Sequence, residues 1–186
     1  MNEGIIQQKT LPNGLIAVRA RSTDTEHVMA LLHNTAKWLQ ERGSTQWNAL
    51  LQGQDTHNTA DAILNGDVFL FKQEGQIAGM VILLTTPSPW DRLLWGNDSV
   101  EESVYVHRLA INRNYTGQHV GSGILAWTAS GIAFPNKRSI RLDCMSGIPA
   151  LESFYRGAGF AYQGRTDNGY LLFEKNLALF PPVNQS

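Results

Sequence analysis

The chain has 186 residues, of which 42% are hydrophobic and 17% are charged, and its 15 Lys and Arg against 16 Asp and Glu leave a net charge of −1. This length suits one domain with a sizeable core, and the composition is that of a folded protein. The balanced charge provides neither the basic footprint of a nucleic-acid-binding protein nor a basic face for a membrane. We therefore expect a single α/β domain over residues 1–186, with its core at about 14–176.

The single cysteine, Cys144, excludes an internal disulfide and favours a reducing compartment. No stretch approaches the roughly 20 apolar residues that cross a bilayer. The first residues lack the basic region and apolar run of a signal peptide. A cytoplasmic enzyme or binding protein is the default expectation.

In chain order, residues 14–20 predict a first strand. Thr23 followed by Glu26 resembles a capping box, and the helical spacing of apolar residues behind it predicts an amphipathic helix over 24–42. Gly43 then ends that helix.

The middle of the chain predicts a short helix, a hairpin and a loop. Glu74-Gly75 separates two strands rich in Val, Ile, Leu and Phe, which is the pattern of a hairpin. The prolines and glycine that follow predict an irregular loop. The ranges are 47–51 for the helix, 67–72 and 76–84 for the strands, and 85–100 for the loop.

The second half alternates strands and helices. Asp167-Asn168-Gly169 is a strong turn signal between the last two strands. The predicted strands are 103–111, 139–144, 160–165 and 170–175, and the predicted helices are 121–133 and 149–157. The order of elements predicts a mixed, largely antiparallel sheet with helices on both faces.

A glycine-bearing turn follows the strand that ends at Ile111. Free amides at a helix N-terminus attract anions, and Gly121 and Gly123 let the backbone approach a phosphate without a Cβ in the way. A tight turn with close helix–strand packing would give the same pattern. The loop is neither a P-loop nor a Gly-x-Gly-x-x-Gly fingerprint.

Residues 105–132 resemble the coenzyme A site of the GCN5-related N-acetyltransferase (GNAT) superfamily. The strand ends in Leu109-Ala110-Ile111, and Gln118, Gly121 and Gly123 fill the pattern Gln/Arg-x-x-Gly-x-Gly/Ala. His119 departs from the usual glycine, and Thr116 from a frequent arginine. The resemblance implies that acetyl-CoA is bound through its pantetheine arm by the main chain of Leu109, Ala110 and Ile111, and through its pyrophosphate by the amides of Gln118, His119, Val120, Gly121, Ser122 and Gly123.

A second stretch matches the same family. Tyr155, Gly159 and Phe160 fill its Tyr-x-x-x-Gly-Phe pattern at a helix end. Ile148 stands where the family often has an asparagine that bonds the coenzyme, and with Leu151 it is assigned to the coenzyme site. The resemblance implies an acetyl-CoA-dependent N-acetyltransferase that transfers directly in a ternary complex. A non-catalytic acyl-CoA-binding protein of the same fold is the alternative.

Two residues are the candidates for proton transfer. The resemblance makes Tyr155 the general acid, and a phenol with a pKa near 10 carries the proton this needs at neutral pH. An alkyl amine with a pKa near 10.4 must lose a proton before it reacts. Strand alternation places Tyr105, His107, Leu109 and Ile111 on one face, which makes His107 a candidate base beside the coenzyme. The alternatives are a core role for Tyr155, and a water chain with a structural His107.

Other polar residues predict no chemistry of their own. Asp143 and Arg108 fit structural ion pairs as readily as a site, and Cys144 fits a buried strand position. The remaining histidines have no metal-ligand spacing, so no metal is expected. These histidines are His27, His33, His57 and His119.

The acceptor is expected to be a small-molecule or peptide amine, with neither nucleic acid nor membrane as a partner; a homodimer is allowed. Trp38, Trp47 and Tyr105 are the candidate acceptor-binding residues. Tryptophans beside acids would attract a cationic amine. The other members of this set are Trp90, Trp95, Asp91, Glu101 and Glu102.

Overall fold

The computed structural model describes residues 1–97 and 100–180. Its main feature is a seven-stranded sheet in which every neighbouring pair is antiparallel except β5 and β7. This confirms the expected mixed, largely antiparallel sheet. In spatial order the strands are β2 (Ile16–Arg19), β3 (Val68–Gln73), β4 (Gln76–Leu84), β5 (Ser103–Ile111), β7 (Ser139–Met145), β9 (Tyr170–Asn176) and β8 (Ala161–Arg165).

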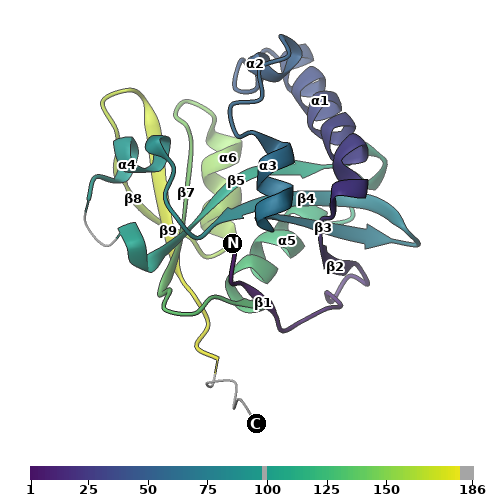
Figure 1. The fold of residues 1–186 in the computed structure, drawn as a ribbon. Helices are drawn as coiled ribbons and strands as arrows, with labels where there is room; N and C mark the ends of the chain where they lie inside the picture. The colour runs from purple at the N-terminus through teal and green to yellow at the C-terminus, as the bar shows by residue number, and fades with distance from the viewer. Residues whose placement is uncertain (98–99, 181–186) are drawn as a thin grey trace.

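Helices cover both faces of this sheet, as expected (Figure 1). Apolar residues of α1 (Thr25–Glu41), α2 (Asn48–Leu51) and α3 (Thr59–Asn65) pack on one face, while α5 (Val120–Ser130) and α6 (Pro149–Gly157) pack on the other. The two faces therefore have separate hydrophobic cores. A small second sheet pairs β1 (Ile5–Ile6) with β6 (Ile132–Ala133).

Local signals placed several elements correctly. β4, β5 and α6 have the predicted bounds. In the hairpin between β3 and β4, Glu74 and Gly75 have φ of 49° and 81°. Two consecutive residues of positive φ match the twist of the flanking strands, which is why this pair makes a tight turn.

The predicted loop at 85–100 is wrong, because it contains helix α4 (Pro89–Trp95). Ser88 Oγ accepts from the Asp91 amide at 3.1 Å, and the Asp91 carboxylate accepts from the Ser88 amide at 2.8 Å. This is a capping box with proline at the first helical position. The prolines, taken as loop signals, here start a helix.

Three further expectations need correction. Helix α3 was not predicted; Asp55 Oδ2 accepts from the Thr59 amide at its start, at 2.6 Å. The helix predicted over 121–133 ends at Ser130, and β6 follows Gly131. The capping contact before α1 is Asp24 with the Arg21 amide, at 2.9 Å, since a 3-10 turn (Ser22–Asp24) precedes the helix.

A one-residue bulge in β5 overturns the predicted alternation. Met80 of β4 pairs with Ala110 and Ile82 pairs with His107, so β5 carries an extra residue between these pairs. Arg108 lies at this point with a φ of 51°. His107 shares the face of Ile82, beneath α1 and α3, whereas Leu109 and Ile111 pack into the core of the opposite face. They do not share a face with His107.

The parallel strands β5 and β7 separate partway along their length. Their pairing runs from Ser103 with Ser139 to Tyr105 with Arg141 and stops there. The later part of β5 therefore pairs with β4 on one side, and its other edge faces the gap that opens toward β7. His107 and Asp143 both lie just beyond the last pair.

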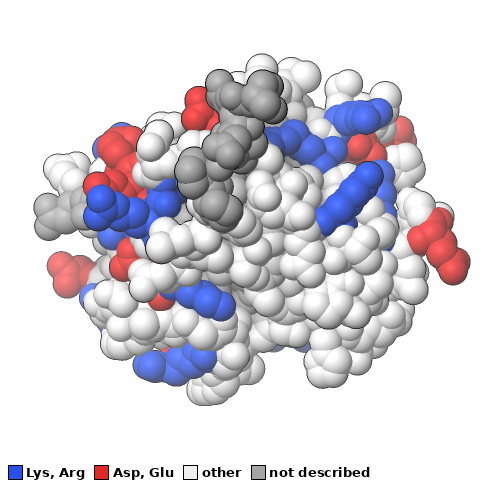
Figure 2. All heavy atoms as spheres, turned by 90° about the horizontal axis from the view of Figure 1, so that it is seen from below, with Lys and Arg blue, Asp and Glu red and all other residues white. Residues whose placement is uncertain are grey.

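The outer surface agrees with the balanced composition. On the face in Figure 2, basic and acidic side chains are interspersed around a mainly uncharged centre. Within the described residues, no helix is both long and apolar enough to cross a membrane.

Candidate active site

A buried acid–histidine pair lies at the gap between β5 and β7. His107 Nε2 is 3.0 Å from Asp91 Oδ1 and 3.1 Å from Oδ2, and the side chains of His107 and Asp91 are 6% and 1% exposed. Burial by itself would raise the pKa of Asp91, but hydrogen bonds from His107 and Ser88 outweigh it and hold that pKa below its usual range. Asp91 is therefore an ionised partner of His107 at neutral pH.

The contact between His107 and Asp91 determines which imidazole nitrogen carries the hydrogen. An ionised carboxylate only accepts hydrogen bonds, so His107 Nε2 must donate. In the neutral ring the lone pair is then on Nδ1, and Nδ1 is the basic atom. Asp91 comes from α4, the helix that the sequence did not reveal.

Asp143 of β7 completes a three-residue cluster. Trp90 Nε1 donates to both Asp143 carboxylate oxygens at 3.3 Å, and burial raises the pKa of Asp143. One potential ligand atom each from Asp91, His107 and Asp143 lies within 4.8 Å of the others. Such a donor set suits a divalent ion, but here each carboxylate already has protein hydrogen-bond donors.

His57 packs against this cluster from the segment between α2 and α3. Its ring centroid is 4.7 Å from that of His107. Burial, together with nearby His107 and Arg108, lowers the pKa of His57 to about 3, so this imidazole is neutral at physiological pH. His57 therefore packs against His107 as an uncharged ring and adds no positive charge to the cluster.

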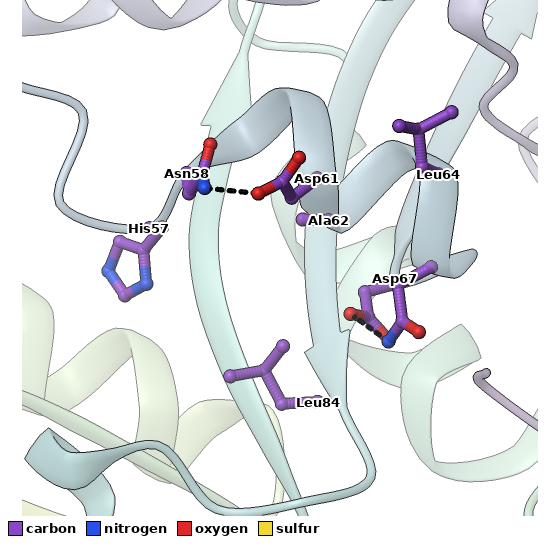
Figure 3. Close-up of a pocket in the computed structure, with 8 residues that line it drawn as sticks. His57, Asn58, Asp61, Ala62, Leu64, Asp67 and Leu84 are labelled. Carbon is purple, nitrogen blue, oxygen red and sulfur yellow. Dashed lines mark hydrogen bonds between the residues drawn. The ribbon is translucent and has the colours of Figure 1, made fainter.

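His57 also lines an open pocket of about 570 Å³ at α3 (Figure 3). The carboxylates of Asp61 and Asp67 contribute to the lining, and so does Leu84. Asn58 donates to Asp61, and Asn2 and Asn65 donate to Asp67. His57 thus contacts both this pocket and His107.

Tyr155 of α6 packs against the core on the face of the sheet opposite to His107. Its ring packs among Phe154, Phe160 and Phe173 at centroid distances of 5.4–6.5 Å. Burial raises the pKa of Tyr155 well above its usual value, with Cys144 and Asp143 adding to the effect. The phenol therefore stays protonated.

Cys144 of β7 is a buried thiol close to Asp143. It is 1% exposed, and burial with nearby Asp143 and Glu152 raises its pKa to about 11. The buried strand position expected for Cys144 is confirmed. The Cys144 thiolate is therefore disfavoured as a nucleophile.

The predicted phosphate loop forms a helix start. His119, with φ 55°, precedes α5, which begins at Val120. The Gln118 and Gly123 amides already donate to Tyr115 and His119 carbonyls. The first-turn amides between them have no acceptor within the helix and face outward from its N-terminus. A Cβ on Gly121 would lie 3.2 Å from Phe154 Cζ, which explains the glycine by close packing of α5 on α6.

Ile148 lies directly before α6, whose first residue is Pro149. Its carbonyl accepts from the Leu151 amide at 3.0 Å, and its side chain makes no capping hydrogen bond. Leu151 is half-buried against the core. An isoleucine thus offers only its backbone and an apolar side chain where the family pattern has a polar residue.

The tryptophans expected to attract a cation already hold the protein's own arginines. Trp38 lies between Arg42 and Arg113, each 4.3 Å from the ring centroid. The guanidinium carbon of Arg108 lies 4.9 Å from the Trp47 ring centroid. Trp95 similarly carries Arg141, and Trp90 is bound to Asp143.

The acids of that set are paired as well. Glu101 contacts Arg92 at 2.7 Å and Glu102 contacts Arg138 at 3.6 Å, while Asp91 holds His107. Tyr105 is 1% exposed and donates to the Val100 carbonyl at 3.0 Å. The aromatic and acidic residues selected from the sequence therefore make contacts within the protein itself.

Sequence reasoning placed Asp91 beside the acceptor but missed its contact with His107, and it missed His57 as a member of the site. The Ser88-Pro89-x-Asp91 capping pattern could have revealed α4, but nothing local connects Asp91 with a histidine 16 residues later. His57 has no motif at all. Both reach His107 only through the packing of α3 and α4 near the sheet.

Comparisons with known proteins agree with this architecture. The sequence model of the acetyltransferase (GNAT) family matches residues 31–160. The uncharacterised N-acetyltransferase YesJ of Bacillus subtilis is 47% identical over 172 residues, covering 92% of this chain and 96% of YesJ.

Solved structures share the fold. A GNAT-family acetyltransferase from Listeria monocytogenes has a TM-score of 0.72 at 33% identity, covering 88% of this chain and 95% of its own. The PaiA N-acetyltransferase of Thermoplasma acidophilum, crystallised in complex with coenzyme A, has a TM-score of 0.63 at 15% identity, over 88% and 99% of the two chains. With the gap between β5 and β7, the helix start at α5 and both sequence motifs in place, the chain belongs to the GNAT family of N-acetyltransferases.

Proposed function

We propose that this enzyme moves the acetyl group of acetyl-CoA directly to a primary amine within a ternary complex. The observation that carries this proposal is the buried Asp91–His107 pair at the gap between β5 and β7. A neutral imidazole held in one tautomer by an ionised carboxylate is a general base. His107 lies on β5, the strand that also contains Leu109-Ala110-Ile111 of the coenzyme motif.

The residues present fit the coenzyme. The edge of β5 beyond Tyr105 faces the gap without a β7 partner, so main-chain groups of Leu109 and Ile111 can pair with an extended ligand. The N-terminus of α5 offers amides to phosphate, each charge gaining about 0.3–1 kcal/mol from the helix dipole. The PaiA enzyme that shares this fold binds coenzyme A.

His107 is assigned the first proton transfer. As the amine nitrogen forms its bond to the acetyl carbon, the amine proton passes to His107 Nδ1, directly or through one water. Asp91 is a positioning residue, because its carboxylate fixes the tautomer and favours the imidazolium that results. His57, neutral above about pH 3, adds no charge that would oppose this step.

Tyr155 is assigned the second proton transfer. As the carbon–sulfur bond breaks, the phenol donates its proton to the departing sulfur. A thiol has a pKa near 8.5, so the sulfur leaves more readily when it receives a proton as the bond breaks. The burial of Cys144 argues against an acetyl-cysteine intermediate and favours direct transfer.

A screen of primary amines with acetyl-CoA, followed by release of free thiol, tests this proposal. In the wild type, kcat/KM should rise with pH through a lower inflection. His107→Gln should lower the rate by roughly 10²–10⁴-fold and remove that inflection. Retention of the inflection in well-folded His107→Gln would place the base elsewhere. Tight coenzyme binding without thiol release from any amine would favour the alternative, a non-catalytic acyl-CoA-binding protein of the same fold.

Asp91→Asn separates positioning from folding. Without the carboxylate the imidazolium is less favoured, so the inflection should move to lower pH while acetyl-CoA binding stays unchanged. Glu101→Gln, which removes an exposed acid paired with Arg92, is the matched control and should leave the profile in place. A loss of stability with an unmoved inflection would make Asp91 purely structural.

A further inference from the structure

Arg108 stands out among the charged residues. It is 8% exposed, follows His107 directly, and has the left-handed φ of 51° that creates the bulge in β5. Non-glycine residues seldom adopt this conformation, and strained residues of this kind cluster at functional sites. Because of the bulge, the side chains of His107 and Arg108 both lie on the face covered by α2 and α3. His107 contacts His57 there, and Arg108 contacts Trp47.

The Arg108 guanidinium makes few polar contacts within the protein. Nη2 donates to Thr56 Oγ1 at 3.2 Å, and the group lies 4.9 Å from the Trp47 ring centroid. The Nε atom is buried and has no hydrogen-bond partner. Within the described ranges, no carboxylate oxygen lies within 4.0 Å of it, so the structural ion pair considered for Arg108 is absent.

An unpaired buried cation is costly. Arginine stays protonated in proteins, so this charge cannot be relieved by deprotonation. Asp55 is close enough to favour the charged form, but its Oδ2 caps α3 and its Oδ1 is itself buried without a partner. Buried charges in folded proteins are normally paired. Arg108 therefore has a carboxylate in its neighbourhood but no direct ion pair with it.

The position of Arg108 indicates which anion it is placed to bind. Thr56 is exposed and accepts from Nη2, so the guanidinium lies beneath the segment between α2 and α3. The neighbouring residue His57 lines the pocket and packs on His107. The coenzyme phosphates belong at the start of α5, beyond the end of β5 and on the other core. The free donors of Arg108 are therefore on the acceptor side of the base.

We propose that the acceptor is an amine that carries a carboxylate, an amino acid, and that Arg108 binds this carboxylate while His107 receives the amine proton. This inference rests on the proposed function. Arginine presents a planar fork that matches a carboxylate with two parallel hydrogen bonds. Trp47 and Thr56 hold the fork in place before the acceptor arrives, which reduces the ordering cost of binding.

The experiment compares amino acids with the amines left when the carboxylate is removed: lysine with 1,5-diaminopentane, and alanine with ethylamine. Wild-type kcat/KM should favour the amino acid of at least one pair by about 10- to 100-fold, the range expected for hydrogen bonds to a charged group. Arg108→Gln should bring that ratio close to one. Arg165→Gln, which removes an exposed arginine on β8, is the control and should keep it.

A second readout does not depend on turnover. With coenzyme A present, the preferred amino acid should raise the melting temperature of the wild type more than its decarboxylated partner does. If Arg108→Gln does not fold, Arg108→Lys replaces it in the experiment. Arg108→Lys keeps the charge without the planar fork, and it should retain a reduced preference for the amino acid over its decarboxylated partner. Coenzyme affinity should be the same in both variants, since a drop would assign Arg108 to a coenzyme phosphate instead.

The outcomes are distinguishable. Equal rates for both members of each pair, or a preference for the diamine, would overturn the carboxylate assignment and leave acetyl transfer to an amine intact; the diamine result would point to Asp61 and Asp67 in the pocket. No turnover with any amine would count against the proposed function. Carboxylate-dependent stabilisation in that case would still support the Arg108 site.

Discussion

The coenzyme half and the acceptor half of the site are built in different ways. The coenzyme half, as proposed above, uses backbone: the free edge of β5 and the first amides of α5, within one continuous stretch. The acceptor half uses side chains brought together from distant segments, with His57, Asp91 and Asp143 gathered around His107. Backbone geometry follows from a short motif, whereas a side-chain cluster requires the whole fold.

The electrostatics of the halves differ in the same way. The α5 N-terminus needs no charged residue to attract phosphate, because aligned peptide dipoles supply the field. The acceptor half concentrates buried ionisable groups whose pKa values move in opposite directions, down for Asp91 and His57 and up for Asp143. Such divergence is typical of functional sites. The following variants test each half separately.

The largest effect is expected at Tyr155. Tyr155→Phe keeps the ring that packs among Phe154, Phe160 and Phe173 but removes the proton. Turnover should fall by roughly 10²–10⁴-fold with coenzyme affinity nearly unchanged. Steady-state rates and calorimetric binding on the same preparation measure both. Undiminished turnover would remove Tyr155 from the chemistry and leave it a core aromatic.

Gly121→Asp should break the coenzyme half alone. The new Cβ would lie 3.2 Å from Phe154 Cζ, and the carboxylate would repel phosphate at the helix start. Wild-type protein should gain about 2.7 kcal/mol of unfolding free energy from acetyl-CoA at 100 times its dissociation constant, with much less from NAD or ATP. The variant should lose this gain. Gly121→Ala, which adds the Cβ without charge, separates crowding from repulsion.

His57 should make the fold sensitive to acid. Its pKa is lowered from 6.5 to about 3, so the unfolded chain binds a proton below 6.5 that the native protein excludes. Stability from this group is complete above pH 6.5 and is lost as the pH falls toward 3. His57→Phe keeps a ring against His107 but cannot protonate.

The free energy of unfolding of this variant should therefore fall less between pH 7 and pH 4 than that of the wild type, by about 1–3 kcal/mol. Urea unfolding at both pH values measures the difference. Asp91 and Asp143 titrate in both proteins, so their contributions cancel in the comparison. Parallel curves would show that His57 is solvated enough to protonate in the folded state.

The smallest effect is expected at Ile148, before α6. Ile148→Asn supplies the polar side chain of the family pattern and should tighten coenzyme binding by about 0.5–1.5 kcal/mol, the value of one hydrogen bond. Titration calorimetry with coenzyme A measures it. Weaker binding would instead show that the isoleucine makes an apolar contact with the ligand.

The sequence by itself determined the backbone half of this protein. The hairpin turn at Glu74-Gly75, the bounds of β5 and α6, and the helix start near Gly121 all depend on neighbours a few residues apart. Hydrophobic periodicity and turn chemistry act over that range, so a single chain displays them. Both family motifs lie in these segments.

Only the tertiary structure decided the side-chain half. Strand alternation placed His107 with Leu109, but the left-handed Arg108 inserts a residue, and its effect appears only in the register against β4. Asp91 became a partner of His107 because α4 packs beside the gap, and the tryptophans proved to be occupied because arginines from distant elements stack on them. Charge pairing and burial depend on contacts across the fold, and local sequence patterns do not record them.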